Sequence, residues 1–122
     1  MRYLTPLSLL AIALLLGVNG CYYDVEEELY PSGCDTANMS FSAHVLPILN
    51  DNCNACHASS AALGGIVLDT YTEVKKQVDN GKLLGSIRHE AGFSPMPQGQ
   101  PQIANCPIDR IAAWIQAGAP NN

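Results

Sequence analysis

The chain has 122 residues, with 11 acidic and 6 basic side chains and a formal net charge of −5. This acidic balance argues against a nucleic-acid-binding protein, which would need a basic surface for phosphates. A protein partner that uses electrostatic steering should instead offer a basic patch. The length allows one small domain besides a targeting segment.

Residues 1–20 have the composition of an export signal. Arg2 precedes an apolar run from Leu7 to Val18, which is interrupted only by Ser8. The run is shorter than the roughly 20 residues that span a bilayer, and it is typical of a signal-peptide core. It ends in V-N-G-C, which resembles the lipobox of bacterial lipoproteins. We expect a lipoprotein signal peptide over 1–20 and a lipid on Cys21; the alternative is an ordinary cleaved signal.

Residues 21–33 are expected to form a flexible acidic tether. Four carboxylates crowd into positions 24–28, where they repel one another and have little apolar surface to bury. An acidic run after a lipidated cysteine also resembles a surface-export signal, with a plain solvated spacer as the alternative. The domain itself is then expected over residues 34–122.

A first helix is predicted to lead up to Cys53. Apolar residues recur at helical spacing from Phe41 to Leu49, and Ser40 or Ser42 can cap the start. Because a proline inside a helix removes a hydrogen bond, the helix either begins near His44 or bends at Pro47.

The run C-N-A-C-H at residues 53–57 carries the strongest chemical signal in the chain. Two thiols three residues apart, followed by an imidazole, form the attachment site of a c-type haem. One helical turn sets Cys53 and Cys56 about as far apart as the two vinyl groups that they attack. His57 is then drawn under the ring as the proximal iron ligand. The motif predicts one covalent haem c.

Two other uses of this motif stay open. A thioredoxin-like C-x-x-C would need a βαβ context, and no alternating strand pattern precedes Cys53. A structural zinc site needs four ligands, and the adjacent Cys56 and His57 do not easily close on one small tetrahedral ion. Haem attachment agrees with the export signal, because the thioethers of haem c form outside the cytoplasm.

Two short helices are predicted after the motif. Thr70 and Glu73 read as a capping box that opens a helix ending before Asn80 and Gly81. Residues 82–88 carry three aliphatic side chains on one side and predict a third helix.

The distal iron ligand is predicted to be Met96. Pro95 and Pro97 stiffen its loop and favour extended backbone, so a helical core role is not expected. Met96 follows His57 by 39 residues, a suitable reach for a loop that crosses to the far face of the haem. A thioether ligand raises the potential relative to a second imidazole.

Three alternatives to Met96 stay open. His89 is near in sequence, but within R-H-E its side chain is expected to be solvated. His44 and Met39 precede the motif, on or before a helix expected to face away from the distal side. An iron position left open on the distal side, or filled by another ligand, is a further alternative.

The last helix is expected to begin at Pro107, with Asp109 at the positive end of its dipole and with Gly118 and Pro120 ending it. Its apolar stripe, with Trp114 alongside, is Ile108, Ile111, Ala112 and Ile115.

Two of the five cysteines, Cys34 and Cys106, remain after the lipid and the haem are assigned. In an oxidising compartment we expect them to pair, with free thiols as the alternative. A bridge closing a loop of about 73 residues would stabilise the fold by ~4 kcal/mol in the chain-entropy model.

From Cys34 to the C-terminus the chain resembles class I c-type cytochromes, especially the small monohaem modules of bacterial lipoproteins. The matching stretches are V-L-P-I-L at 45–49, C-N-A-C-H at 53–57, G-G-I-V-L at 64–68, Met96-Pro97 and W-I-Q-A-G-A-P at 114–120. The resemblance implies an all-α domain of three to five helices around one haem, with the first and last helices crossing beside it. It also implies thioethers at Cys53 and Cys56 and iron ligands at His57 and Met96. The Cys34/Cys106 pair departs from many members.

The expected function is therefore a lipid-anchored carrier of single electrons in the cell envelope, facing the periplasm or the surface. Its partners would be redox proteins, a respiratory complex among them, either as a shuttle or as a fixed subunit. Neither enzymatic activity nor a small-molecule substrate is expected. The alternative is a five-coordinate haem enzyme or sensor, such as a peroxidase or gas binder, if Met96 does not ligate iron.

Overall fold

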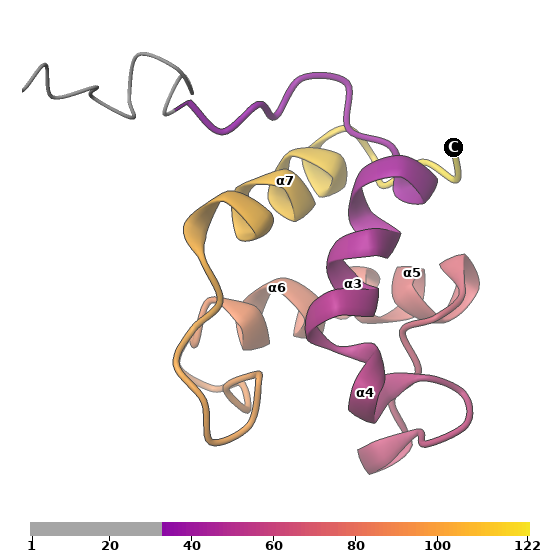
Figure 1. The fold of residues 1–122 in the computed structure, drawn as a ribbon, viewed down its shortest axis with the longest axis vertical. Coiled ribbons are helices and arrows are strands. Elements are labelled where there is room, and N and C mark those ends of the chain that lie inside the picture. Colours follow the sequence, from indigo (N-terminus) through magenta and orange to yellow (C-terminus); the bar gives the residue numbers. More distant parts are fainter. Residues whose placement is uncertain (1–32) are drawn as a thin grey trace, which may run out of the picture. The chain divides into compact units, whose positions relative to one another are not determined.

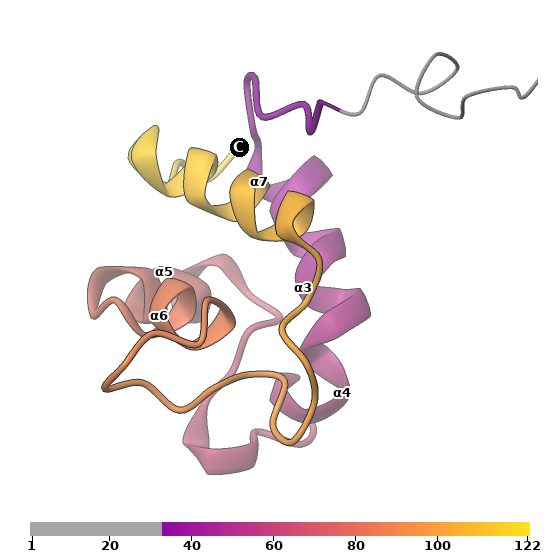
Figure 2. The ribbon, with the colours of Figure 1, turned by 90° about the vertical axis from the view of Figure 1, so that its left-hand side faces the viewer.

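The computed structural model describes residues 33–122, shown in two views in Figures 1 and 2. Over this range the chain forms helices and loops, with no β-strand. The predicted all-α class is therefore confirmed for these residues, and residues 34–122 form one compact unit. The expected signal peptide, the lipidated Cys21 and the tether up to residue 32 lie outside the described residues.

The first helix changes its hydrogen-bonding pattern next to its proline. It begins as a wide π-helical segment, η1 (Phe41–Val45), and continues as α3 (Leu46–Asn52). The Ser40 side chain caps η1 by accepting the Ala43 N–H at 3.1 Å. Pro47 lies in the first turn of α3. Because Pro47 has no N–H to donate, the ladder changes from π to α geometry beside it.

Cys53, whose φ of −127° and ψ of −39° are not helical, separates α3 from the single turn α4 (Asn54–His57). The Cys53 N–H still donates to the Leu49 carbonyl at 2.8 Å, and the Cys53 carbonyl accepts the His57 N–H at 3.0 Å. The motif therefore starts its own helical turn at the end of α3.

Two short helices follow a 3₁₀ turn, η2 (Leu63–Gly65): α5 (Tyr71–Asp79) and α6 (Lys82–Ile87). The expected capping box is wrong, because the Thr70 side chain makes no capping hydrogen bond. Glu73 instead pairs with Lys76 at 2.6 Å. The helix still begins at the expected place, held by the burial of Val74 in the core.

The last helix, α7 (Asn105–Gln116), begins two residues before the expected Pro107. Proline fits anywhere in a first turn, since the first four N–H groups of a helix have no intrahelical partner. Asp109 consequently lies beyond the first turn, which holds no acidic residue. The helix ends at Gln116, and Gly118 follows the cap with a φ of 94°, which is readily adopted only by glycine.

The core forms where α3, α5, α6 and α7 meet. Figures 1 and 2 show α7 above the α5–α6 pair, with α3 running beside both. The largest fully buried side chains are Trp114, Leu49, Ile111, Val45 and Val74.

The stripe on α7 differs from the expectation at two positions. Trp114 is fully buried, whereas Ile115 is only partly buried. The segment after α7 explains the burial of Trp114, because the Pro120 carbonyl accepts the Trp114 indole N–H at 2.9 Å. A buried indole needs such a partner.

The two ends of the domain are tied to its helices. The sulfurs of Cys34 and Cys106 are 2.07 Å apart and the Cα atoms 5.3 Å apart, which is disulfide geometry. At the other end, the Asn122 carbonyl accepts the Ser42 N–H at 2.9 Å and the Ser42 hydroxyl at 2.8 Å. The first link joins the segment before η1 to α7, and the second joins η1 to the segment after α7.

Candidate functional site: a cavity between the C-x-x-C-H turn and the Met96 loop

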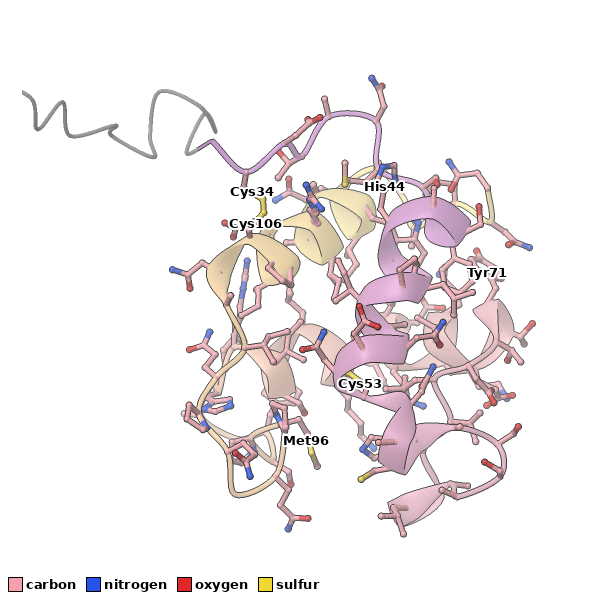
Figure 3. All side chains as sticks on the ribbon, in the orientation of Figure 1. Cys34, His44, Cys53, Tyr71, Met96 and Cys106 are labelled. Atoms are coloured by element: carbon pink, nitrogen blue, oxygen red, sulfur yellow. A yellow bond between two sulfur atoms is a disulfide. The ribbon has the colours of Figure 1, made fainter. Side chains whose placement is uncertain are left out.

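A cavity of about 780 Å³ lies between α4 and the loop that follows α6. One wall comes from the motif, with Cys53, Cys56 and His57, and another from the loop, with Phe93 and Met96. Figure 3 shows Cys53 and Met96 on these two separate parts of the chain. Further aliphatic side chains line the cavity, namely Leu63, Ile66, Leu68, Leu83, Ile87 and Ile103.

The polar part of the lining consists mainly of neutral side chains. Gln77, Gln98 and Gln100 contribute amides, and Lys82 is the one lysine or arginine in the lining. Gln98, Gln100 and Lys82 are exposed, so these groups lie where the cavity meets solvent. The lining is therefore largely apolar, with polar groups and the exposed Leu63 at its mouth, and apolar linings with a few polar groups are usual for small-molecule and cofactor sites.

The two motif thiols are not joined to each other. Burial raises the pKa of the Cys53 thiol to about 11, so this thiol stays protonated at neutral pH. A dithiol oxidoreductase instead lowers the pKa of its attacking cysteine. The surroundings of Cys53 therefore do not suit thioredoxin-like exchange.

The imidazole of His57 is oriented by the loop that follows it. Its Nδ1 lies 3.3 Å from the Ile66 carbonyl, and the His57 carbonyl accepts the Leu68 N–H at 2.7 Å. An Nδ1–H that donates to Ile66 leaves the lone pair on Nε2. Metal-binding histidines are commonly held in this way by a backbone carbonyl.

Asp69 closes the same loop. Its carboxylate accepts the Ser59 N–H at 2.7 Å. This backbone hydrogen bond and one from the Ser59 side chain lower the pKa of Asp69. The segment between α4 and α5 is thereby held to itself by the Ser59–Asp69 contact and to His57 by Ile66 and Leu68.

Met96 is held by both of its backbone polar groups. Its N–H donates to the Ser86 carbonyl at 3.0 Å, and its carbonyl lies 3.0 Å from Nε2 of His89. Met96 itself is half-buried and lines the cavity.

The three alternative distal ligands do not line the cavity. Met39 is buried in the core, and Nδ1 of His44 accepts the Ser40 N–H at 3.0 Å. Figure 3 shows His44 far from Met96. The expectation that His89 is solvated is wrong: its half-buried ring lies against the Met96 carbonyl.

Sequence reasoning missed the contact between Gly85 and Phe93. A Cβ at position 85 would lie 2.4 Å from Cδ2 of Phe93, so only glycine lets this ring lie against α6. The available signal was the glycine inside a short helix, which weakens the helix unless another group needs the space.

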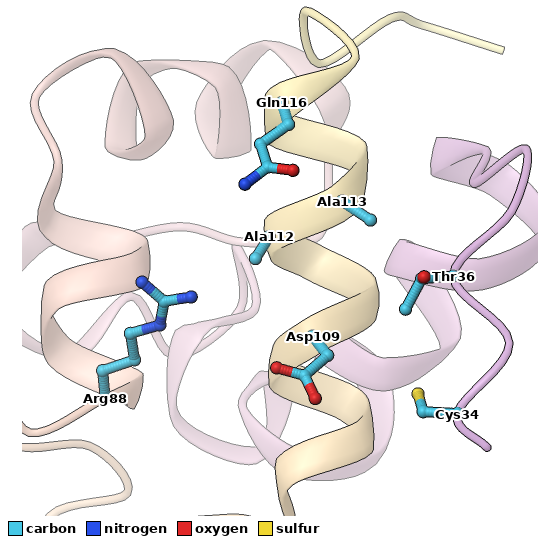
Figure 4. A pocket seen from close by; sticks show the side chains of 7 residues that line it. All are labelled: Cys34, Thr36, Arg88, Asp109, Ala112, Ala113 and Gln116. Atoms are coloured by element: carbon cyan, nitrogen blue, oxygen red, sulfur yellow. The ribbon is translucent and has the colours of Figure 1, made fainter.

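A smaller polar groove of about 370 Å³ lies elsewhere, along α7 and next to residues 34–36 and Arg88. Figure 4 shows Arg88 and Asp109 at this groove, on α6's end and on α7, with Cys34 nearby. It shares no lining residue with the cavity.

Among residues 33–122, no group of three or more His, Cys, Asp and Glu side chains is placed to hold a metal ion. Nor is any helix in this range long and apolar enough to cross a membrane. Comparisons of the chain with family models, curated proteins and solved structures found no match.

Proposed function

We propose that this protein is a small c-type cytochrome, with one haem bound covalently in the 780 Å³ cavity. The observation that carries the proposal is the donor set of that cavity: two thiols and an imidazole on one wall and a thioether on another. A porphyrin brings its own equatorial ligands, so the chain need supply only axial ones. The apolar lining suits a large apolar macrocycle, and it has no carboxylate that would compete for the iron.

Each donor has a separate role in this proposal. Cys53 and Cys56 form the two thioethers, and burial keeps the Cys53 thiol neutral until it reacts. His57 is the proximal ligand through Nε2, oriented by Ile66. Met96 is the distal ligand. The bound haem would supply reversible one-electron chemistry at its iron.

With the Met96 sulfur bound to the iron, the protein carries electrons and does not transform a substrate. An imidazole and a thioether leave no iron position for a substrate or gas. His57 and Met96 would then hold the iron, and the aliphatic lining would exclude water from it. A five-coordinate enzyme or sensor is the alternative if Met96 stays off the iron.

We also propose that Cys21 carries a lipid and anchors the domain to a membrane of the cell envelope, outside the cytoplasm. Support comes from the apolar run of residues 7–18 that ends just before Cys21. The partners in this proposal are redox proteins.

Covalent attachment is tested by coexpression with a haem c maturation system, followed by haem staining of denaturing gels. The unmodified chain should give a stained band, and the pair C53A and C56A should abolish it. As a control, C34S with C106S removes two other cysteines and should keep the band. A purified chain with zinc and no covalent haem would contradict the proposal.

A further inference from the structure

We propose that His89 is a positioning residue that holds the Met96 loop against the cavity. The inference rests on the proposed function, because it assigns His89 a role in keeping Met96 on the iron. The starting observation is the 3.0 Å contact between Nε2 of His89 and the Met96 carbonyl.

The backbone of His89 is in a conformation that histidine adopts at a cost. Its φ is 54°, in the left-handed region where a Cβ crowds the backbone. The residue follows the end of α6: the His89 N–H donates to the Ser86 carbonyl and the Glu90 N–H donates to the Gly85 carbonyl at 2.9 Å. These two bonds form a Schellman motif, in which this position is usually glycine.

The end of α7 shows the same motif with the usual residue. There the Gly118 N–H donates to the Ile115 carbonyl and the Ala119 N–H to the Trp114 carbonyl, both at 2.9 Å. Gly118 occupies the left-handed position, with φ 94°. The helix end therefore needs no imidazole. What the side chain of His89 adds is its contact with Met96.

Three contacts attach the Met96 loop to α6 and its end. The Phe93 ring lies against Gly85, the Met96 N–H donates to Ser86, and the Met96 carbonyl lies against His89. Only the last depends on a replaceable polar side chain. Removing it should therefore loosen Met96 without releasing the whole loop.

The test is His89→Gly in the haem-loaded protein. Glycine relieves the left-handed backbone, so the variant should unfold at the same temperature as the unmodified protein or higher. Imidazole binding to the ferric protein, which requires Met96 to leave the iron, should nevertheless become roughly fivefold faster, as expected for the loss of one hydrogen bond. A residue that only ends the helix would not produce this combination.

Two further variants sharpen the result. His89→Gln keeps a donor of similar reach and should return the imidazole rate toward that of the unmodified protein. Asn38→Gly changes another left-handed residue, with φ 51°, that is exposed and does not line the cavity. This control should leave the rate unchanged.

The outcomes separate the two proposals. Suppose that the unmodified ferric protein shows the sulfur-to-iron charge-transfer band and that His89→Gly binds imidazole at the unmodified rate. The positioning role of His89 is then wrong, and the proposal that Met96 is the distal ligand is retained. If the unmodified protein binds haem but lacks this band, Met96 is not the distal ligand, and the role proposed for His89 is wrong as well.

Discussion

In the proposed cytochrome, the sulfur of Met96 decides whether the protein carries electrons or leaves an iron position open for enzymatic chemistry or gas binding. Met96 was predicted from two flanking prolines and a distance along the chain, and the structure adds that it lines the same cavity as His57. Neither Met39 nor His44 lines that cavity. At the scale of single residues, the candidate ligands are thus brought together by contacts across 39 residues of chain.

Met96→Ala should open the sixth iron position. We expect loss of the charge-transfer band, binding of carbon monoxide to the ferrous form and a potential lower by on the order of 0.1 V, within the range that axial ligands set. Met96→His should lower the potential while keeping the site closed. Met39→Leu is the matched control, a volume-conserving change in the core. Rapid, stoichiometric carbon monoxide binding by the unmodified protein would favour the enzyme or sensor.

At the scale of elements, the segment between α4 and α5 holds His57 in place. Ile66 contacts the imidazole, and Asp69 contacts Ser59 at the other side of the loop. Between these contacts the segment forms the 3₁₀ turn η2 (Leu63–Gly65), so its side-chain and backbone hydrogen bonds help to hold His57 in place.

Asp69→Asn should destabilise the haem-loaded protein at neutral pH and have less effect in acid. The pKa of Asp69 is lowered on folding, so its carboxylate stabilises the fold above the ordinary pKa of about 3.9 for aspartate. This stabilisation is lost as pH falls through the lower folded pKa. Thermal unfolding of both proteins between neutral pH and about pH 3 measures the difference.

Asp51→Asn, at an exposed carboxylate of α3, controls for the loss of one charge. A difference between Asp69→Asn and the unmodified protein that stays constant across this pH range would show that the carboxylate charge at Asp69 has no such role.

At the scale of the whole molecule, links at both ends hold a small helical domain closed. The Cys34–Cys106 pair joins the start of the domain to the first turn of α7. The Asn122 carbonyl joins the segment after α7 to Ser42 in η1. Such links matter in a domain of 89 residues, which buries a smaller fraction of its surface than a larger one.

The disulfide should be present in the purified protein. Alkylation of the unreduced, unfolded chain should label neither Cys34 nor Cys106. C34S with C106S should lower the free energy of unfolding by up to ~4 kcal/mol, because the unfolded chain regains the freedom of a loop of about 73 residues. Stoichiometric labelling of both thiols would exclude the bridge.

The proposed lipid anchor is tested at the mature N-terminus. Mass spectrometry should find an acylated Cys21, and Cys21→Ser should yield either a soluble form or an unprocessed precursor. An unmodified terminus at another residue would reject lipidation and leave the haem proposal unaffected.

The sequence by itself determined those features that depend on neighbouring residues. The C-N-A-C-H run places its thiols and imidazole within one helical turn, and Gly81 and Gly118 mark helix ends through their backbone freedom. Only the tertiary structure decided which distant residues share a surface: the contact of His89 with Met96, the fit of Phe93 against Gly85 and the burial of Trp114. Those pairings depend on how whole helices pack, which short-range spacing does not specify.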